Sequence, residues 1–237
     1  MRKVGFLGAY EKTEIILYIA KLLISLKKTV LVIDSTITQK AKYVVPVINP
    51  TTTYITEFEK IDVAVGFKDF KSLKEYLGIS NEEELKYDFV LIDIDSSKCV
   101  ENFEMEKAYK NYFVTAFDVY SLKRGLESID TVENPIKLTK VYMSNQDSRD
   151  DDEYVNFLSM GYKVEWEKYK VYFPVSLSDK DAIVENQKIN KIKFSNVSQQ
   201  YKNSIQYITE EITKEIVTQQ EIKKTIKLVE KEEWLCQ

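Results

Sequence analysis

The sequence predicts an α/β fold with a doubly wound, mostly parallel sheet flanked by helices. Three apolar runs, residues 4–7, 29–34 and 87–93, have the length and composition of buried parallel strands. Residues 15–23 follow the first run with apolar positions at helical spacing, so a strand, a loop and a helix succeed one another. This alternation is typical of sheets whose strands are joined by covering helices.

The remaining segments continue the alternation. Residues 35–56 contain Pro46, Pro50 and three consecutive threonines, and we expect loop and edge structure there instead of helix. Further strands are expected at residues 61–65, 112–116, 137–143 and 169–175. Further helices are expected at residues 70–77, ended by Gly78, at about 101–110, at 122–132 and at 199 to about 228. Residues 144–152 are expected to form an exposed polar loop.

Length and composition favour one globular domain. A chain of 237 residues that is 44% hydrophobic can bury one large core. The net charge of −4 argues against a general electrostatic attraction to nucleic acid or anionic lipid, although Lys188, Lys191 and Lys193 form a small basic cluster. Cys99 and Cys236 provide no disulfide or zinc framework, and the lack of histidine excludes histidine-based metal sites and general bases. We expect a cytoplasmic protein without a membrane span.

We expect residues 1–217 to form this domain and residues 218–237 to form a C-terminal helical tail. The tail contains lysines and apolar residues at helical spacing. However, Glu230, Glu232 and Glu233 precede Trp234, and such carboxylates oppose binding to an anionic membrane surface. A partner-binding or frayed tail is therefore expected instead of a membrane-surface helix.

The segment of residues 3–14, Lys-Val-Gly-Phe-Leu-Gly-Ala-Tyr-Glu-Lys-Thr-Glu, has the position and the Lys-Thr end of a phosphate-binding loop. The candidate nucleotide-binding residues, for ATP or ADP, are Gly8, Ala9, Tyr10, Glu11, Lys12 and Thr13. Thr13 and Asp93, the acid that ends the third apolar run, are candidate ligands of Mg²⁺ through water. Tyr10 would stack on a base or fill the pocket. In the alternative reading Thr13 only caps a helix and Lys12 is solvated.

An ordered set of segments resembles the ParA/MinD family, the deviant Walker A ATPases among the P-loop NTPases. The segments are Lys12-Thr13, Val30-Leu-Val-Ile-Asp34, Tyr87-Asp-Phe-Val-Leu-Ile-Asp93, Val114-Thr115 with Asp118-x-x-Ser-Leu122, Val141-Tyr-Met-Ser-Asn145 and Phe173-Pro174. The resemblance runs from residue 1 to about residue 217. It implies a P-loop NTPase-like fold, Mg²⁺ with ATP or ADP, protein partners, a homodimer closed across the nucleotide, and adenine contact by Asn145.

The departures from the family pattern concern hydrolysis. By the resemblance, the signature lysine that reaches the partner subunit falls on Leu7, the last glycine of the loop on Glu11, and the second aspartate of the second strand on Thr36. A carboxylate about 4 Å from a phosphate charge costs about 1–4 kcal/mol, and a glutamate in a left-handed conformation costs roughly 1–2 kcal/mol more. We therefore assign no catalytic residue. Leu7 and Tyr10 become candidate anchors for a constitutive dimer or a partner.

Three functions are left open. The first is a degenerate ParA/MinD-like hub that positions or regulates an assembly of the pilus, secretion or conjugation type, with weak or absent ATP hydrolysis and recruitment to the membrane through a partner. The second is an active ATPase of the same type with an unusual loop. The third is a DNA-partition protein, which the acidic net charge disfavours.

Overall fold

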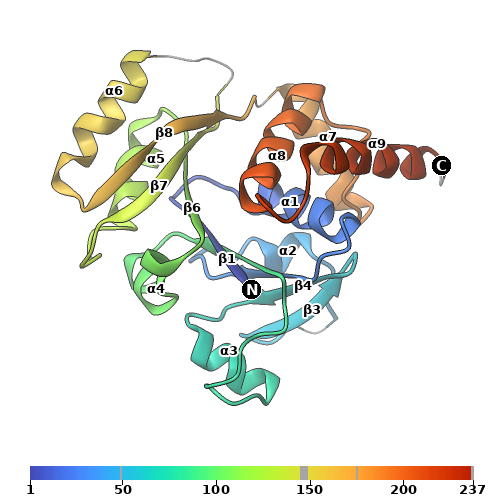
Figure 1. The fold of residues 1–237 in the computed structure, drawn as a ribbon, viewed down its shortest axis with the longest axis horizontal. Coiled ribbons are helices and arrows are strands. Elements are labelled where there is room, and N and C mark those ends of the chain that lie inside the picture. The colour runs from blue at the N-terminus through green and yellow to red at the C-terminus, as the bar shows by residue number, and fades with distance from the viewer. Residues whose placement is uncertain (49, 145–148, 175, 236–237) are drawn as a thin grey trace.

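The computed structural model describes residues 1–48, 50–144, 149–174 and 176–235, which fold around one eight-stranded sheet (Figure 1). The strands are β1 (Arg2–Leu7), β2 (Val30–Asp34), β3 (Tyr54–Phe58), β4 (Ile61–Val65), β5 (Phe89–Ile94), β6 (Lys110–Thr115), β7 (Ile136–Tyr142) and β8 (Val164–Tyr172). The helices are α1 (Thr13–Ser25), α2 (Ala41–Val44), α3 (Phe70–Leu77), α4 (Ser97–Asn102), α5 (Val119–Glu127), α6 (Arg149–Leu158), α7 (Leu177–Lys188), α8 (Gln199–Ile212) and α9 (Gln219–Leu235), with 3-10 turns at Met105–Lys107 and Ser159–Gly161.

The strands lie in the order β3-β4-β2-β5-β1-β6-β7-β8, and β3 is the antiparallel strand at one edge. The other neighbouring pairs are parallel, so the predicted doubly wound, mostly parallel sheet is confirmed. The chain crosses from one half of the sheet to the other between β5 and β6, which lie on either side of β1. In sheets of this kind ligands bind outside the carboxyl ends of the strands at such a reversal.

Helices cover both faces of the sheet (Figure 1). Helices α1, α7, α8 and α9 contribute to the apolar core on one face, and α3, α4 and α5 contribute to the core on the other. Successive residues of β1 point to opposite faces, so Phe6 belongs to the first core and Leu7 to the second. Burial on both faces explains why the central strands are mostly apolar.

Most of the predicted elements are confirmed, within a few residues at their ends. Helix α3 has the predicted bounds, and Gly78 ends it in the left-handed conformation with φ 68°. The helix predicted at about 101–110 is wrong, because α4 ends at Asn102 and β6 begins at Lys110. Glu104 adopts φ 49°, and Lys3 Nζ donates hydrogen bonds to the carbonyls of Phe103 and Glu104. These contacts with β1 stabilise a turn instead of a continuing helix.

The prediction for residues 35–56 holds for the edge strand β3, but the short helix α2 also lies there. Two further helices of the described chain, α6 and α7, were not predicted. The expected loop at residues 144–152 becomes α6 from Arg149, and its Val155 packs against Leu122 and Tyr142. Helix α7 follows β8, which begins at Val164, earlier than the expected 169.

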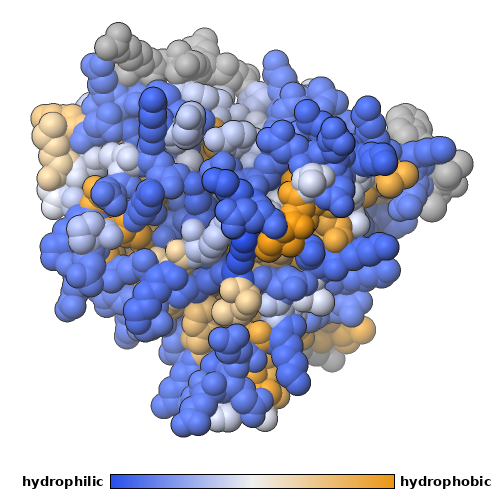
Figure 2. Space-filling model, in the orientation of Figure 1, coloured by the Kyte–Doolittle hydropathy of each residue, from blue (hydrophilic) through white to orange (hydrophobic). Residues whose placement is uncertain are grey.

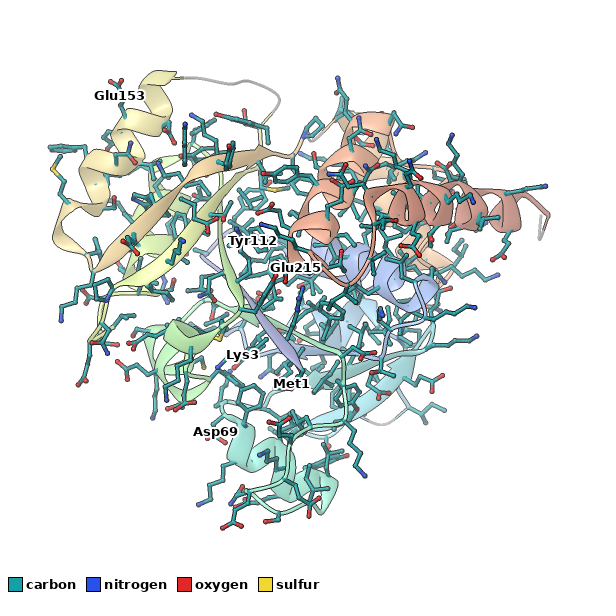
Figure 3. All side chains as sticks on the ribbon, viewed as in Figure 1. Met1, Lys3, Asp69, Tyr112, Glu153 and Glu215 are labelled. Carbon is teal, nitrogen blue, oxygen red and sulfur yellow. The ribbon has the colours of Figure 1, made fainter. Side chains whose placement is uncertain are left out.

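The long helix predicted from residue 199 is divided into α8 and α9 by a turn in which Glu215 adopts φ 70°. Arg2 Nη1 donates to the carbonyl oxygens of Ile212 and Lys214, both at 2.8 Å. These hydrogen bonds satisfy backbone carbonyl groups at the end of α8. Figure 3 shows Glu215 close to the start of β1. A side chain from the other end of the chain, which no local pattern predicts, stabilises this turn.

Helix α9 packs against α1 and α8. Ile222, Ile226 and Val229 are buried in the core on that face, and each such side chain contributes roughly 1.5–3 kcal/mol. Glu233 accepts hydrogen bonds from the amides of Phe194 and Ser195 at 2.9 and 2.8 Å. Among the described residues, no helix combines the length and apolar composition needed to cross a membrane.

Candidate phosphate-binding site

The loop between β1 and α1 lies at the carboxyl edge of the sheet, beside the ends of β5 and β6. Gly8 begins it with φ 122°, and a Cβ atom there would lie 2.4 Å from the carbonyl oxygen of Val114. The amide of Gly8 donates to the carbonyl oxygen of Ile94 at 3.1 Å. Both the backbone conformation and this close approach require glycine, so Gly8 fixes where the loop leaves the sheet.

Lys12 is folded beneath the loop, with 2% of its surface exposed. Its Nζ lies 2.7 Å from Asp93 Oδ1 and donates to the carbonyl oxygen of Gly8 at 2.8 Å. Thr13 Oγ1 donates to Asp93 Oδ2 at 3.2 Å. The alternative reading, a solvated Lys12 before a capping Thr13, is therefore wrong: Thr13 is the first residue of α1, and its hydroxyl faces Asp93.

Asp93 is the centre of this cluster, and it is buried at the end of β5. Burial raises the pKa of its carboxyl to about 7, and the adjacent Lys12 ammonium opposes that rise. Its Oδ1 is ion-paired with the Lys12 ammonium, and its Oδ2 accepts a hydrogen bond from Thr13. The structure thus brings together three residues predicted for the site, as a closed set of contacts.

Glu11 places a carboxylate at the amino end of α1. Its Oε1 accepts a hydrogen bond from the amide of Thr13 at 2.9 Å. The exposed amides and the dipole at a helix N-terminus attract anions, and here the Glu11 carboxylate supplies the negative charge. The prediction that Glu11 adopts a strained left-handed conformation is wrong, since the positive-φ residues of the described chain do not include Glu11.

Glu11 belongs to a polar network whose other members, Glu14, Lys40 and Gln187, sequence reasoning missed. Lys40 Nζ lies 3.8 Å from Glu11 Oε1 and 3.4 Å from Glu14 Oε1, and Gln187 of α7 donates to the Glu14 carboxylate. Burial raises the pKa of Glu14, and the Lys40 charge acts in the opposite direction. Only the acid in the first helical turn was recognisable locally, because Gln187 is 173 positions away in the chain.

Above the loop is a small cavity of about 200 Å³. Tyr10 lines it and also packs against the core, and burial raises the pKa of its hydroxyl. Tyr120 and Arg124 of α5, which sequence reasoning did not single out, also line it. The other lining residues are Ala9, Glu11, Lys12, Thr13, Thr36, Ile37, Thr38, Asp93 and Asp95.

The second-strand acid has a structural role. Asp34 Oδ1 accepts from the amide and the hydroxyl of Thr36 at 3.1 and 2.6 Å, and Oδ2 accepts from the amide of Ala41 at 2.9 Å. Leu7 is fully buried, so the idea that it anchors a dimer or partner is wrong. Asn145, predicted to contact adenine, lies outside the described residues.

The arrangement does not fit Mg²⁺ with a nucleoside triphosphate as it stands. Cavities for such ligands usually measure about 300–1,000 Å³, more than the about 200 Å³ found here. The lysine and the first helical amide already have carboxylate partners. Asp93 Oδ1 is ion-paired with the Lys12 ammonium, and Oδ2 accepts the hydrogen bond of Thr13 Oγ1.

No protein-family model and no curated protein matches the sequence. The structure is similar to a ParA family ATPase from Chlorobium tepidum, with TM-score 0.57, 16% identity, and 87% of this chain and 96% of that chain covered. It is similar to a putative plasmid partition protein from Borrelia burgdorferi bound to AMPPNP, with TM-score 0.57, 13% identity, and coverage of 89% and 96%. For a chain of the MinC:MinD cell division complex from Aquifex aeolicus, the TM-score is 0.54, the identity 13%, and the coverage 92% and 98%. The chain therefore has the ParA/MinD-like fold that the sequence resemblance implied.

Proposed function

We propose that the chain is a ParA/MinD-like positioning or regulatory protein that acts through protein partners, binds ATP weakly and hydrolyses it slowly or not at all. The observation that supports this proposal is that the groups of the loop already have protein partners. Glu11 accepts a hydrogen bond from the amide of Thr13, and Asp93 is ion-paired with Lys12. The groups that would bind phosphate are satisfied by the protein itself. In this proposal the protein acts in the cytoplasm and is recruited to an assembly through a partner.

A nucleotide would have to replace these contacts, and doing so costs free energy. Leaving one member of a buried ion pair without its partner costs about 3–5 kcal/mol, and this cost opposes moving Lys12 away from Asp93. A phosphate charge about 4 Å from the Glu11 carboxylate adds about 1–4 kcal/mol. Since each 1.4 kcal/mol changes a dissociation constant about tenfold, a total of about 4 kcal/mol converts micromolar affinity to millimolar affinity.

The positioning part of the proposal comes from the likeness in fold. The similar structures include a ParA family ATPase, a putative plasmid partition protein and a complex of MinD with MinC, in which one protein binds another. A fold shared at such low identity supports a positioning role but does not identify the cellular assembly that is positioned, because one fold can carry sites with different functions. We therefore propose a protein partner and leave the pilus, secretion or conjugation assembly as the candidate setting.

A binding titration of Mg-ATP against the purified chain tests the proposal. We expect a dissociation constant weaker than about 0.1 mM and hydrolysis indistinguishable from the background without protein. Tight binding, with turnover that Lys12→Ala abolishes, would overturn the proposal. It would favour the second candidate, a working ATPase with an unusual loop, which the convergence of Gly8, Lys12, Thr13 and Asp93 supports.

A further inference from the structure

Lys40 lies between two carboxylates at the amino end of α1. Its Nζ is 3.4 Å from Glu14 Oε1 and 3.8 Å from Glu11 Oε1. Hydrophilic residues cover most of the face drawn in Figure 2, where water surrounds their charges. By contrast, only 28% of the Lys40 side chain is exposed, so its charge interacts with the two carboxylates in a less polar environment. Within the described residues, no other lysine or arginine is ion-paired with Glu11 or Glu14.

The contact between Lys40 and Glu14 is anchored by a second helix. Only 16% of the Glu14 side chain is exposed, and its carboxylate accepts a hydrogen bond from Gln187 of α7. Burial raises the pKa of the Glu14 carboxyl, and the Lys40 charge opposes that rise. Because this contact does not depend on Glu11, the Lys40 ammonium is held beside the amino end of α1 by Glu14 alone.

The Glu11 carboxylate is easier to displace. Its side chain is 44% exposed, so it can rotate into water, and it gives up one hydrogen bond from the amide of Thr13 when it does. In the structure this carboxylate is an anion bound at the end of the helix, with the Thr13 amide on one side and the Lys40 ammonium on the other. An anion that replaced it would face the same two groups.

The other cations near the loop are less suited to meet such an anion. Lys12 is buried and ion-paired with Asp93 at 2.7 Å, and moving it would leave a buried carboxylate without its cation. Arg124 lines the cavity but pairs with Glu127 at 2.8 Å on an exposed part of α5. Such an exposed pair is weak, so Arg124 is the rival cation. Lys40 has to break no buried pair.

We infer that Lys40 is the cation that contacts a phosphate group of a nucleotide at this loop, pairing with Glu11 in the closed loop and with phosphate once Glu11 is displaced. The inference rests on the proposed function, in which the protein's own groups occupy the loop. Glu11 lines the cavity whereas Lys40 does not, so the contact with phosphate forms only after Glu11 has moved. The role belongs to a residue of the connection between β2 and α2, not to the lysine of the loop.

The test is titration of pyrophosphate, which carries phosphate groups without a base, against Glu11→Gly and Glu11→Gly/Lys40→Met by calorimetry. We expect Lys40→Met to weaken binding about tenfold, because one partly exposed charged contact is lost. Raising the salt concentration should reduce this difference, since salt screens charges. Glu11→Gly/Lys40→Arg keeps the charge and should retain most of the affinity. A role of Lys40 in packing alone would give neither the salt dependence nor the rescue.

The matched control is Lys42→Met in the Glu11→Gly background. Lys42 is also half-buried and lies on α2, but it has no carboxylate at ion-pair distance among the described residues and does not line the cavity. It should leave pyrophosphate binding unchanged, and Arg124→Met should weaken binding less than Lys40→Met does. If Lys40→Met fails to fold, Lys40→Met/Glu14→Gln takes its place, because it removes the cation and the buried charge together.

Equal affinity with and without Lys40 would overturn the inference. A larger loss in Arg124→Met, or no pyrophosphate binding by Glu11→Gly, would overturn it as well. These outcomes leave the proposed function standing, because that is judged by Mg-ATP binding to the unchanged chain. Tight Mg-ATP binding by the unchanged chain would instead overturn the proposed function, while the comparison of Glu11→Gly with Glu11→Gly/Lys40→Met would still decide the role of Lys40.

Discussion

The carboxylate of Glu11 accepts a hydrogen bond from the backbone amide of Thr13, at 2.9 Å, in the first turn of α1. This is a local contact between residues two positions apart, and it places a negative charge where the helix dipole attracts an anion. Lys40 lies near the same carboxylate and adds positive charge. The amino end of α1 therefore has an anion of its own.

Replacing Glu11 by glycine should strengthen Mg-ATP binding by about tenfold or more, because it removes a like charge near the phosphates and frees the amide of Thr13. Isothermal titration calorimetry measures the change. Glu11→Gln is the control for charge, since it keeps the size of the side chain. If neither variant binds ATP more tightly than the unchanged chain, another feature closes the site, and the Lys12–Asp93 pair is the first candidate.

Breaking the Lys12–Asp93 pair should destabilise the fold. Lys12→Met leaves a buried carboxylate without its cation, and we expect the free energy of unfolding to fall by about 3–5 kcal/mol. Urea denaturation at pH 8 measures it. Lys71→Met is the matched control, because Lys71 pairs with Glu75 at 4.0 Å on an exposed helical face and should cost about 0.5 kcal/mol or less. Equal costs for the two variants would show that the buried pair is not formed in solution.

The oligomeric state should not respond to nucleotide. By the sequence resemblance, the lysine that contacts the partner subunit falls on Leu7, whose side chain is fully buried and cannot interact with a second chain. A ligand shifts an assembly equilibrium only through different affinities for the two states. Sedimentation velocity profiles with and without Mg-ATP should superimpose. A monomer-to-dimer shift on adding Mg-ATP would contradict this and favour the working ATPase.

Lys3 should make stability depend on alkaline pH. Burial lowers the pKa of its ammonium to about 8 in the folded chain, from 10.5, and Figure 3 shows Lys3 on β1 near the start of the chain. Between these two pKa values the unfolded chain binds more protons than the folded chain does. The free energy of unfolding of the unchanged protein should therefore rise with pH relative to that of the Lys3→Met variant. The difference between the two proteins removes the contribution of buried tyrosines such as Tyr112, whose raised pKa acts in the opposite direction. A difference that stays flat from pH 8 to 10.5 would contradict the prediction.

Much of the fold could be predicted from the sequence, because apolar periodicity and glycine positions are local properties. The runs that became β2, β4 and β5 are apolar except for one aspartate in each, since both faces of the sheet are covered there. Gly78 ends α3 because glycine adopts positive φ at little cost. Lys12 and Thr13 follow one central strand, and Asp93 lies at the end of the neighbouring strand. These positions predicted that the three residues meet at one edge of the sheet.

Only the tertiary structure decided how the site residues are paired. Lys12 is ion-paired with Asp93, Glu11 accepts a hydrogen bond from the amide of Thr13, and Gln187 donates to Glu14. These pairings depend on burial and on elements that are distant in the chain. The end of α8 likewise depends on Arg2, which lies 210 positions away from Ile212. Sequence patterns report which face of an element is buried, but a polar side chain selects its partner only after packing has excluded water and set the distances.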